Sequence, residues 1–212
     1  MHQLPLDVQL ADYAVFESFY PGSNAAAVHA LGLAAAGEGS PVVWLWGPRE
    51  SGKTHLLQAC VSEASQRKRD TAYLPLGSAH GLGPRMLDGM GQADLLCIDG
   101  AEAIAGDPDW EQQLFVVFEA LTQHGGRLVL AGSEAVAGCK FGLPDLASRL
   151  MSGEIYRLNG LTDEERVAAL QLRASWRGFQ LPDKTGRYLI ARVDRGAGAL
   201  FTLLDQLDQA AL

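Results

Sequence analysis

Residues 47–54 read GPRESGKT, which is the spacing Gly-x-x-x-x-Gly-Lys-Thr of a phosphate-binding loop. The apolar run VVWLWG (42–47) precedes this segment, and a repeat of Leu56, Leu57, Cys60, Val61 and Ala64 follows it. The run predicts a buried strand and the repeat predicts a helix. Because a loop of this type joins a strand to a helix, its context favours a nucleotide-binding α/β protein.

Further apolar runs predict strands at 71–76, 94–100, 127–133 and 154–158, with Pro75 acceptable only on an edge strand. Asp107 and Pro108 predict the N-cap and first residue of a helix. Strands that alternate with helices are typical of a parallel sheet covered on both faces. We therefore expect an αβα sandwich with a parallel sheet.

The pattern changes after Leu158. Thr162 and Glu165 have the spacing of a capping box, and the helix that they open is expected to stop at Gly178. Two more helical segments follow, and the last shows no stop signal before Leu212. We expect a flexible segment over 1–12, a nucleotide-binding domain over 13–159 and a small all-helical domain over 160–212, which lacks its tail.

In the loop, glycines let backbone N–H groups turn toward phosphates, and the following helix presents its positive end. Lys53 is expected to reach the β- and γ-phosphates and Thr54 to hold Mg²⁺. Ser133, at the end of the strand 127–133, either contacts the γ-phosphate or is an ordinary strand-end serine. The expected nucleotide-binding residues are Gly47, Pro48, Arg49, Glu50, Ser51, Gly52, Lys53, Thr54, His55, Ser133 and Arg195.

Asp99 ends the strand 94–100 and is expected to hold Mg²⁺ through water, opposite Thr54. The position that usually orients the attacking water is Gly100, which has no side chain for that role. Glu102 is the nearest acid, two residues too late to be taken as equivalent. These residues predict nucleotide binding with slow hydrolysis by the chain alone.

The formal net charge is −8. Residues 1–139 hold 16 acidic and 7 basic side chains, and residues 140–212 hold 9 acidic and 10 basic side chains. Neither part has the basic surface that DNA binding favours. Cys60, Cys97 and Cys139 lack metal-ligand or disulfide spacing. The stretch from Ala25 is too short to cross a bilayer, and the start lacks a signal-peptide pattern. We expect a cytoplasmic protein with a protein partner, reduced cysteines and no membrane contact.

The segments GKTHLLQA, LPDLASRL, RGFQLPD and LDQLD together resemble the Hda family of DnaA regulators, which belongs to the DnaA-like AAA+ ATPases. The likeness runs from Gln3 to the end of the chain. It implies an AAA+ αβα sandwich with a helical lid, and ADP or ATP with Mg²⁺ as ligands, ADP being the active form in the family. It also implies that the protein binds the polymerase III sliding clamp and stimulates hydrolysis of the ATP bound to DnaA.

The resemblance assigns two functional segments. Residues Gln3, Leu4, Pro5 and Leu6 correspond to the clamp-binding peptide, although Asp7 does not fit a place that usually holds an aromatic residue or leucine. Arg149, in LPDLASRL, corresponds to the arginine finger that enters a neighbour's ATP site. We expect Arg149 on a helix at the edge of the sheet's nucleotide-binding face. The alternative for Arg149 is a surface pair with Asp145 one helical turn earlier.

Three departures from the family concern the nucleotide: Gly100, the tail of the lid, and Gly198, where the family has a lid arginine. Arg195 either replaces that arginine or solvates a helix start. Self-association as a homodimer or higher oligomer stays open, and sequence-specific DNA binding is not expected. Two other functions remain: a DnaA-like adaptor or helicase loader that grips a helicase or DNA, and an autonomous P-loop kinase or ATPase.

Overall fold

The computed structural model describes residues 14–78 and 83–192. Within them, one parallel sheet has the strand order β2-β3-β4-β1-β5. The strands are β1 (Val42–Trp46), β2 (Thr71–Pro75), β3 (Leu95–Asp99), β4 (Arg127–Gly132) and β5 (Glu154–Arg157). The five predicted strands are confirmed, with ends that differ by no more than one residue. Pro75 lies on β2, an edge strand, where its missing N–H costs no ladder bond.

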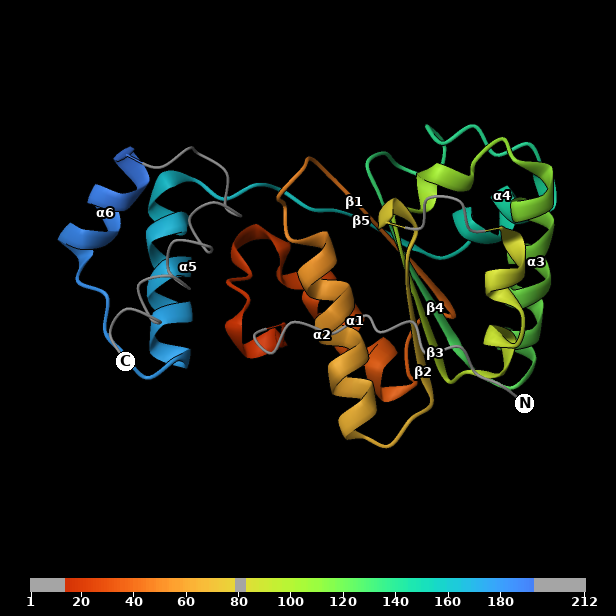
Figure 1. Ribbon diagram of the computed structural model, residues 1–212, viewed down its shortest axis with the longest axis horizontal. Coiled ribbons are helices and arrows are strands. Elements are labelled where there is room, and N and C mark those ends of the chain that lie inside the picture. The colour runs from red at the N-terminus through yellow and green to blue at the C-terminus, as the bar shows by residue number, and fades with distance from the viewer. Residues whose placement is uncertain (1–13, 79–82, 193–212) are drawn as a thin grey trace.

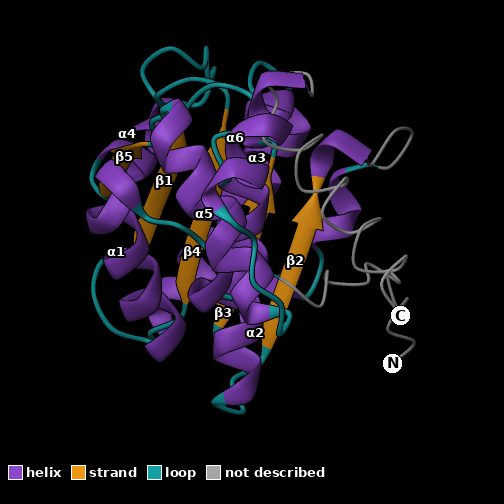
Figure 2. Cartoon of the chain, turned by 90° about the vertical axis from the view of Figure 1, so that its left-hand side faces the viewer, coloured by secondary structure: helices purple, strands orange, loops and turns teal. Residues whose placement is uncertain are grey.

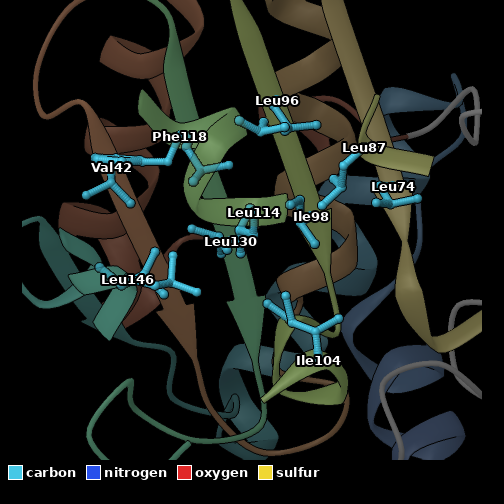
Figure 3. Close-up of a cluster of buried hydrophobic side chains, with 14 of the residues drawn as sticks. Val42, Leu74, Leu87, Leu96, Ile98, Ile104, Leu114, Phe118, Leu130 and Leu146 are labelled. Carbon is cyan, nitrogen blue, oxygen red and sulfur yellow. The ribbon is translucent and has the colours of Figure 1, made fainter. Parts of the chain in front are cut away.

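Helices cover both faces of the sheet (Figure 1). On one face α1 (Ala25–Ala36) and α2 (Lys53–Gln66) pack against Val43 and Leu45 of β1. On the other face α3 (Pro108–Gln123) and α4 (Pro144–Met151) pack against Val42 and Trp44. The alternation follows from the two-residue period of a strand, and burial on both faces explains the continuous apolar runs. Figure 3 shows the second core, where Leu114 and Phe118 of α3 meet Leu96 and Leu130 of the sheet.

The C-terminal part of the described chain is helical. It consists of α5 (Asp163–Trp176) and α6 (Asp183–Arg192), which share a small core of Leu170, Ala174 and Leu181. The predicted capping box forms, because the Thr162 side chain accepts from the Glu165 N–H and the Glu165 carboxylate accepts from the Thr162 N–H. Figure 1 shows these helices to one side of the sandwich, with α5 beside the segment that precedes α1.

Two further local predictions can be compared with the structure. The Asp107 side chain accepts from the N–H groups of Asp109 and Trp110, so the predicted N-cap of α3 is confirmed. The alanine-rich stretch from Ala25 forms α1, which ends at Gly37 in the left-handed conformation. None of the helices in residues 14–78 and 83–192 is long and apolar enough to cross a bilayer.

The C-terminal ends of β1, β3 and β4 lie together at the same end of the sheet. The register pairs Trp46 with Gly132 and Ala131 with Asp99, so the ends of β1, β4 and β3 are level. The residues that come next along these strands are therefore neighbours in space: Gly47, Ser133 and Gly100. Figure 2 shows the strands side by side, with helices on both sides of the sheet. A ligand at this end of the sheet is within reach of all three strands, as is usual for parallel sheets.

Candidate functional site

The loop between β1 and α2 has the close packing that its glycines permit. Gly52 has φ +92°, and a Cβ there would lie 2.6 Å from Cε2 of Phe19. A Cβ on Gly47 would lie 2.5 Å from the carbonyl oxygen of Leu158. Neither position accepts a side chain. Pro48, Arg49 and Glu50 form the exposed outer part of the loop.

Lys53 lies at the start of α2 with its ammonium group turned into the loop. Its Nζ donates to the carbonyl oxygens of Gly47 and Pro48, each at 2.8 Å. Burial lowers the pKa of Lys53, and the nearby carboxylates of Asp99 and Glu102 oppose that shift. The ammonium is therefore a partly desolvated cation at the mouth of the loop, which is the position that a phosphate-binding lysine requires.

Thr54 and Asp99 lie together, as the sequence predicted for a shared metal. The Thr54 Oγ1 donates to Asp99 Oδ2 at 2.6 Å, and the Tyr73 hydroxyl donates to the same oxygen at 3.2 Å. Burial, followed by the charge of Asp99, raises the pKa of Tyr73, so this phenol stays protonated and remains a donor. The pair supplies a hydroxyl and a carboxylate oxygen, which suit Mg²⁺.

The described residues contain no cluster of three His, Cys, Asp or Glu side chains that could hold a metal alone. Mg²⁺ commonly takes one or two protein oxygens and completes its shell with phosphates and water. The donors at Thr54 and Asp99 therefore fit an ion that arrives with a nucleotide.

Ser51 supplies a second observation that fits a phosphate ligand. Its side chain is buried, and within the described part of the chain Oγ has no hydrogen-bond partner. A buried hydroxyl without a partner is costly, so this position suits an acceptor brought by a ligand. A phosphate oxygen in the loop is such an acceptor.

His55 faces the N-terminal segment and the lid. Its Nε2 lies 3.0 Å from the carbonyl oxygen of Val15, and its ring lies 5.5 Å from that of Phe19 between centroids. Burial lowers the pKa of His55, the hydrogen bond with Val15 opposes that shift, and the charge of Arg173 on α5 adds to it. His55 is therefore neutral near pH 7, at a place where α2, the lid and the segment before α1 meet.

The predicted site residues at the strand ends lie close together. Ser133 is exposed directly after β4, beside the end of β1. Gly100 has φ +76° and ψ 36°, and begins a short 3-10 helix, Ala101–Ile104, which carries Glu102. One carboxylate oxygen of Glu102 lies 3.4 Å from the position that a Cβ on Gly132 would occupy. Glu102 thus lies at the nucleotide site, where the sequence predicted Asp99 as the only acid from this segment.

Arg149 is on the predicted helix, α4, but its placement on the nucleotide-binding face was wrong. The helix leads into β5, whose first residue, Glu154, pairs with Val43 near the start of β1. Arg149 therefore lies near the N-terminal ends of the strands, whereas the phosphate loop follows the C-terminal end of β1. Its Nε lies 3.2 Å from Glu119 Oε1 on α3, so its partner is on another helix and is not Asp145.

Several predicted residues lie outside the residues that the structure describes. They are Gln3, Leu4, Pro5 and Leu6 of the clamp segment, and Arg195 with Gly198 of the lid.

Comparisons with known proteins identify the architecture. Residues 163–212 match the family model described as Hda, lid domain. Domain III of the replication initiation protein DnaA from Thermotoga maritima is similar, with 22% identity and a TM-score of 0.76 over 95% of this chain and 91% of that chain. The C-terminal helices thus match an Hda lid domain, and the fold of the chain is similar to that of DnaA domain III.

Two longer structures are similar to this Hda-like chain. One is a DNA replication initiation factor, with 20% identity and a TM-score of 0.75 over 92% of this chain and 64% of that one. The other is a replication initiator DnaA bound to AMPPCP and single-stranded DNA, with 19% identity and a TM-score of 0.77 over 94% of this chain and 66% of that one. This chain thus spans less than two thirds of either. The resemblance and fold class predicted from the sequence are confirmed.

The sequence did not indicate two residues of the site, Tyr73 and Phe19, and it named Glu102 only as an acid too late to be taken as equivalent. Tyr73 bonds to Asp99 from an edge strand, Phe19 covers Gly52, and Glu102 reaches the end of β4. The pairing of β2 with β3 could have suggested Tyr73, because Tyr73 lies on β2 and Asp99 lies on β3. No periodicity marks Phe19, because it belongs to a segment without regular alternation.

Proposed function

We propose that this chain is a nucleotide-bound regulator of replication initiation, which binds the sliding clamp and stimulates hydrolysis of the ATP held by DnaA. The Hda lid domain at 163–212 and the DnaA-like fold support a role linked to DnaA. The acidic net charge of −8 favours protein partners over direct DNA binding.

ADP or ATP is the proposed ligand of the loop between β1 and α2. Lys53 would contact the phosphates, Ser51 would donate to one of their oxygens, and Thr54 with Asp99 would hold Mg²⁺. The ion would neutralise phosphate charge when bound. Arg49 and Glu50 would lie on the outer rim, and His55 would stay neutral behind the loop. Ser133 is proposed to contact the terminal phosphate from the end of β4.

The observation that carries the proposed action on another protein is the position of Arg149. The side chain is 55% exposed and lies toward the start of the strands. With a rise of about 3.3 Å per residue, a five-residue strand separates the two edges by about 15 Å. Arg149 is therefore remote from the nucleotide loop of its own chain, which supports action at the nucleotide of a neighbouring subunit.

The chemistry suits an arginine supplied from outside. Phosphoryl transfer spreads negative charge over the γ-phosphate oxygens, and a guanidinium stabilises that charge with paired donors. Arg149 would supply this group to the ATP of DnaA. The attacking water would be positioned by DnaA, so a glycine at position 100 would not prevent the reaction.

The segment Gln3, Leu4, Pro5 and Leu6 is proposed to bind the clamp. The Gln3 amide can bond main-chain groups, the two leucines can fill apolar pockets, and Pro5 restricts the free chain. Burying two leucine side chains contributes roughly 3–6 kcal/mol before the cost of ordering the segment.

ATP hydrolysis by the cognate DnaA tests the proposal when measured with and without this protein, the clamp and DNA. Stimulation is expected only with all components present, and Gln3→Ala with Leu4→Ala should remove both clamp pull-down and stimulation. Lys53→Ala should lose nucleotide binding, and Lys184→Ala, at an exposed lid position, should not. Intact nucleotide binding without stimulation would overturn the proposal.

The same preparation separates the other functions. Turnover of about 1 per second or more by the purified chain alone indicates an autonomous ATPase. Strong, salt-dependent binding to single-stranded DNA indicates a loader or adaptor. We expect neither.

A further inference from the structure

Gly100 gives the chain a sharp turn directly after Asp99. Its left-handed φ of +76° strains any residue with a side chain, and a Cβ there would also lie 3.3 Å from the Gly77 N–H nitrogen. The turn starts the 3-10 helix Ala101–Ile104 and carries Glu102 back over the sheet edge. Position 100 therefore has no acidic side chain, and the turn that its glycine allows brings Glu102 to the site instead.

The carboxylate of Glu102 lies beside the end of β4. One of its carboxylate oxygens, Oε2, lies 3.4 Å from the position of a Cβ on Gly132. Gly132 pairs with Trp46, the residue before the nucleotide loop, and it precedes Ser133. Oε2 therefore lies at the end of the central strand, between the loop and the end of β3.

The Oε2 atom is buried, and no hydrogen bond from residues 14–78 or 83–192 reaches it. A carboxylate without a partner costs free energy, so a structural role does not explain its placement. Burial lowers the pKa of Lys53, and the charges of Asp99 and Glu102 oppose that shift, whereas for Cys139 burial raises the pKa and the charge of Glu102 adds to the rise. The carboxylate of Glu102 thus lacks a hydrogen-bond donor at Oε2, while its charge acts on Lys53 across the mouth of the loop.

We propose that Glu102 is a specificity-determining residue of the nucleotide site, which weakens the binding of a nucleoside triphosphate relative to the diphosphate. This inference rests on the proposed nucleotide site. Lys53 would contact the β- and γ-phosphates, and Ser133 follows Gly132, beside which Oε2 of Glu102 lies. The terminal phosphate would enter the space that this carboxylate faces. The two like charges repel in a partly desolvated site, where screening by water is weak.

The test compares affinities and does not depend on catalysis. Isothermal titration calorimetry with ADP and with AMPPCP, in the presence of Mg²⁺, gives the ratio of the two dissociation constants. In Glu102→Gln the affinity for AMPPCP should rise about five- to thirty-fold, while that for ADP changes less than about twofold. Glu102→Asp keeps the charge and should stay close to the wild-type ratio.

Matched controls separate this charge from the others nearby. Glu134→Gln removes an exposed carboxylate from the loop after the same strand, and should leave the ratio within about twofold of wild type. Glu102→Gln should unfold at or above the wild-type temperature, because an amide is cheaper to bury than a carboxylate.

An unchanged ratio in Glu102→Gln, or weaker AMPPCP binding, would overturn the proposal. Weaker binding would mean that Glu102 holds the metal or its water. If the wild-type chain binds neither ADP nor AMPPCP, the proposed nucleotide site itself fails, and Glu102 fails with it. Intact binding with an unchanged ratio removes only the role of Glu102.

Discussion

The side chain of Asn24 is hydrogen-bonded at both ends to the main chain of Asn159. Its Oδ1 accepts from the Asn159 N–H at 2.8 Å, and its Nδ2 donates to the Asn159 carbonyl at 3.1 Å. Asn159 links β5 to the lid, and the Leu158 N–H before it donates to the carbonyl of Trp46 at 2.7 Å. The segment that enters the lid is therefore tied both to the start of α1 and to the strand that leads into the nucleotide loop.

Asn24→Ala should loosen this connection. Asn24 is 4% exposed, and its loss removes both bonds, so the free energy of unfolding should fall by about 1–2 kcal/mol. Limited proteolysis should cut faster between β5 and α5. Asn24→Asp should be no better, because it places a carboxylate oxygen against the Asn159 carbonyl. Ser23→Ala is the control, since Ser23 only accepts an exposed bond from Asn159 at 3.3 Å. Equal urea midpoints for wild type and Asn24→Ala would contradict this view.

A second set of hydrogen bonds, which the sequence did not indicate, positions α4. Glu111 on α3 is 1% exposed, and its carboxylate accepts from the N–H groups of Gly106 at 2.6 Å, Gly142 at 2.9 Å and Leu143 at 2.6 Å. Leu143 is the N-cap of α4, so Glu111 holds the start of the helix that carries Arg149.

Glu111→Ala should be strongly destabilising, because three backbone N–H groups lose a charged acceptor in part-buried hydrogen bonds. We expect a loss of at least about 3 kcal/mol in urea unfolding. Glu111→Gln keeps one acceptor oxygen and should lose less. Glu119→Gln on the same helix changes only an exposed pair and should cost under about 1 kcal/mol. If Glu111→Ala costs no more than Glu119→Gln, the three bonds do not support α4.

The Cys139 thiol gives a pH-dependent readout of the charges around it. Burial, followed by the charges of Glu102 and Glu134, raises its pKa from 9.0 to about 11. Negative neighbours disfavour the thiolate, which is the form that reacts with iodoacetamide. The alkylation rate should therefore keep rising between pH 9 and pH 11 instead of levelling near 9.

Two variants make this profile specific. Glu102→Gln should move the midpoint to lower pH, and Cys139→Ser should abolish the signal, since Cys60 and Cys97 are buried in the core. Circular dichroism at each pH confirms that the chain stays folded. A wild-type profile that levels at the ordinary thiol pKa would refute the assigned surroundings of Cys139.

The centre of the sheet was predictable because β1, β3 and β4 are buried on both faces and therefore appear as continuous apolar runs. The caps at Asp107 and Thr162 were predictable because each acts within four residues of chain. Glu111 was not, since a single acid in an amphipathic helix is usually exposed, and its three partners lie in two separate loops.

The candidate site was predictable where a motif fixes it and not where the fold brings residues together. Lys53, Thr54 and Asp99 follow from spacing and from strand ends. Glu102 could not be placed from the sequence, because its position depends on the left-handed turn at Gly100. The side of the sheet on which Arg149 lies depends on the direction of α4 and on the register of β5, neither of which spacing reveals.

Arg149 offers the sharpest test of action on a partner. Its pair with Glu119 is 55% and 37% exposed, so Arg149→Ala should change the free energy of unfolding by less than about 1 kcal/mol. Nucleotide and clamp binding should also persist. Stimulation of DnaA-bound ATP hydrolysis should nevertheless fall by about 10³ or more, the effect of removing such fingers in other nucleotide hydrolases.

The control variants for Arg149 distinguish a finger from a surface charge. Arg149→Lys should fail almost as badly as Arg149→Ala, because an ammonium cannot reproduce the planar fork of donors. Glu119→Gln should retain stimulation, since it frees the guanidinium without removing it. The rate of phosphate release from DnaA, measured with the clamp and DNA present, decides between these outcomes. If Arg149→Ala stimulates as well as wild type, the finger lies elsewhere. Arg157, whose guanidinium lies 5.3 Å from the ring centroid of Trp46, and Arg195 are then the next residues to test.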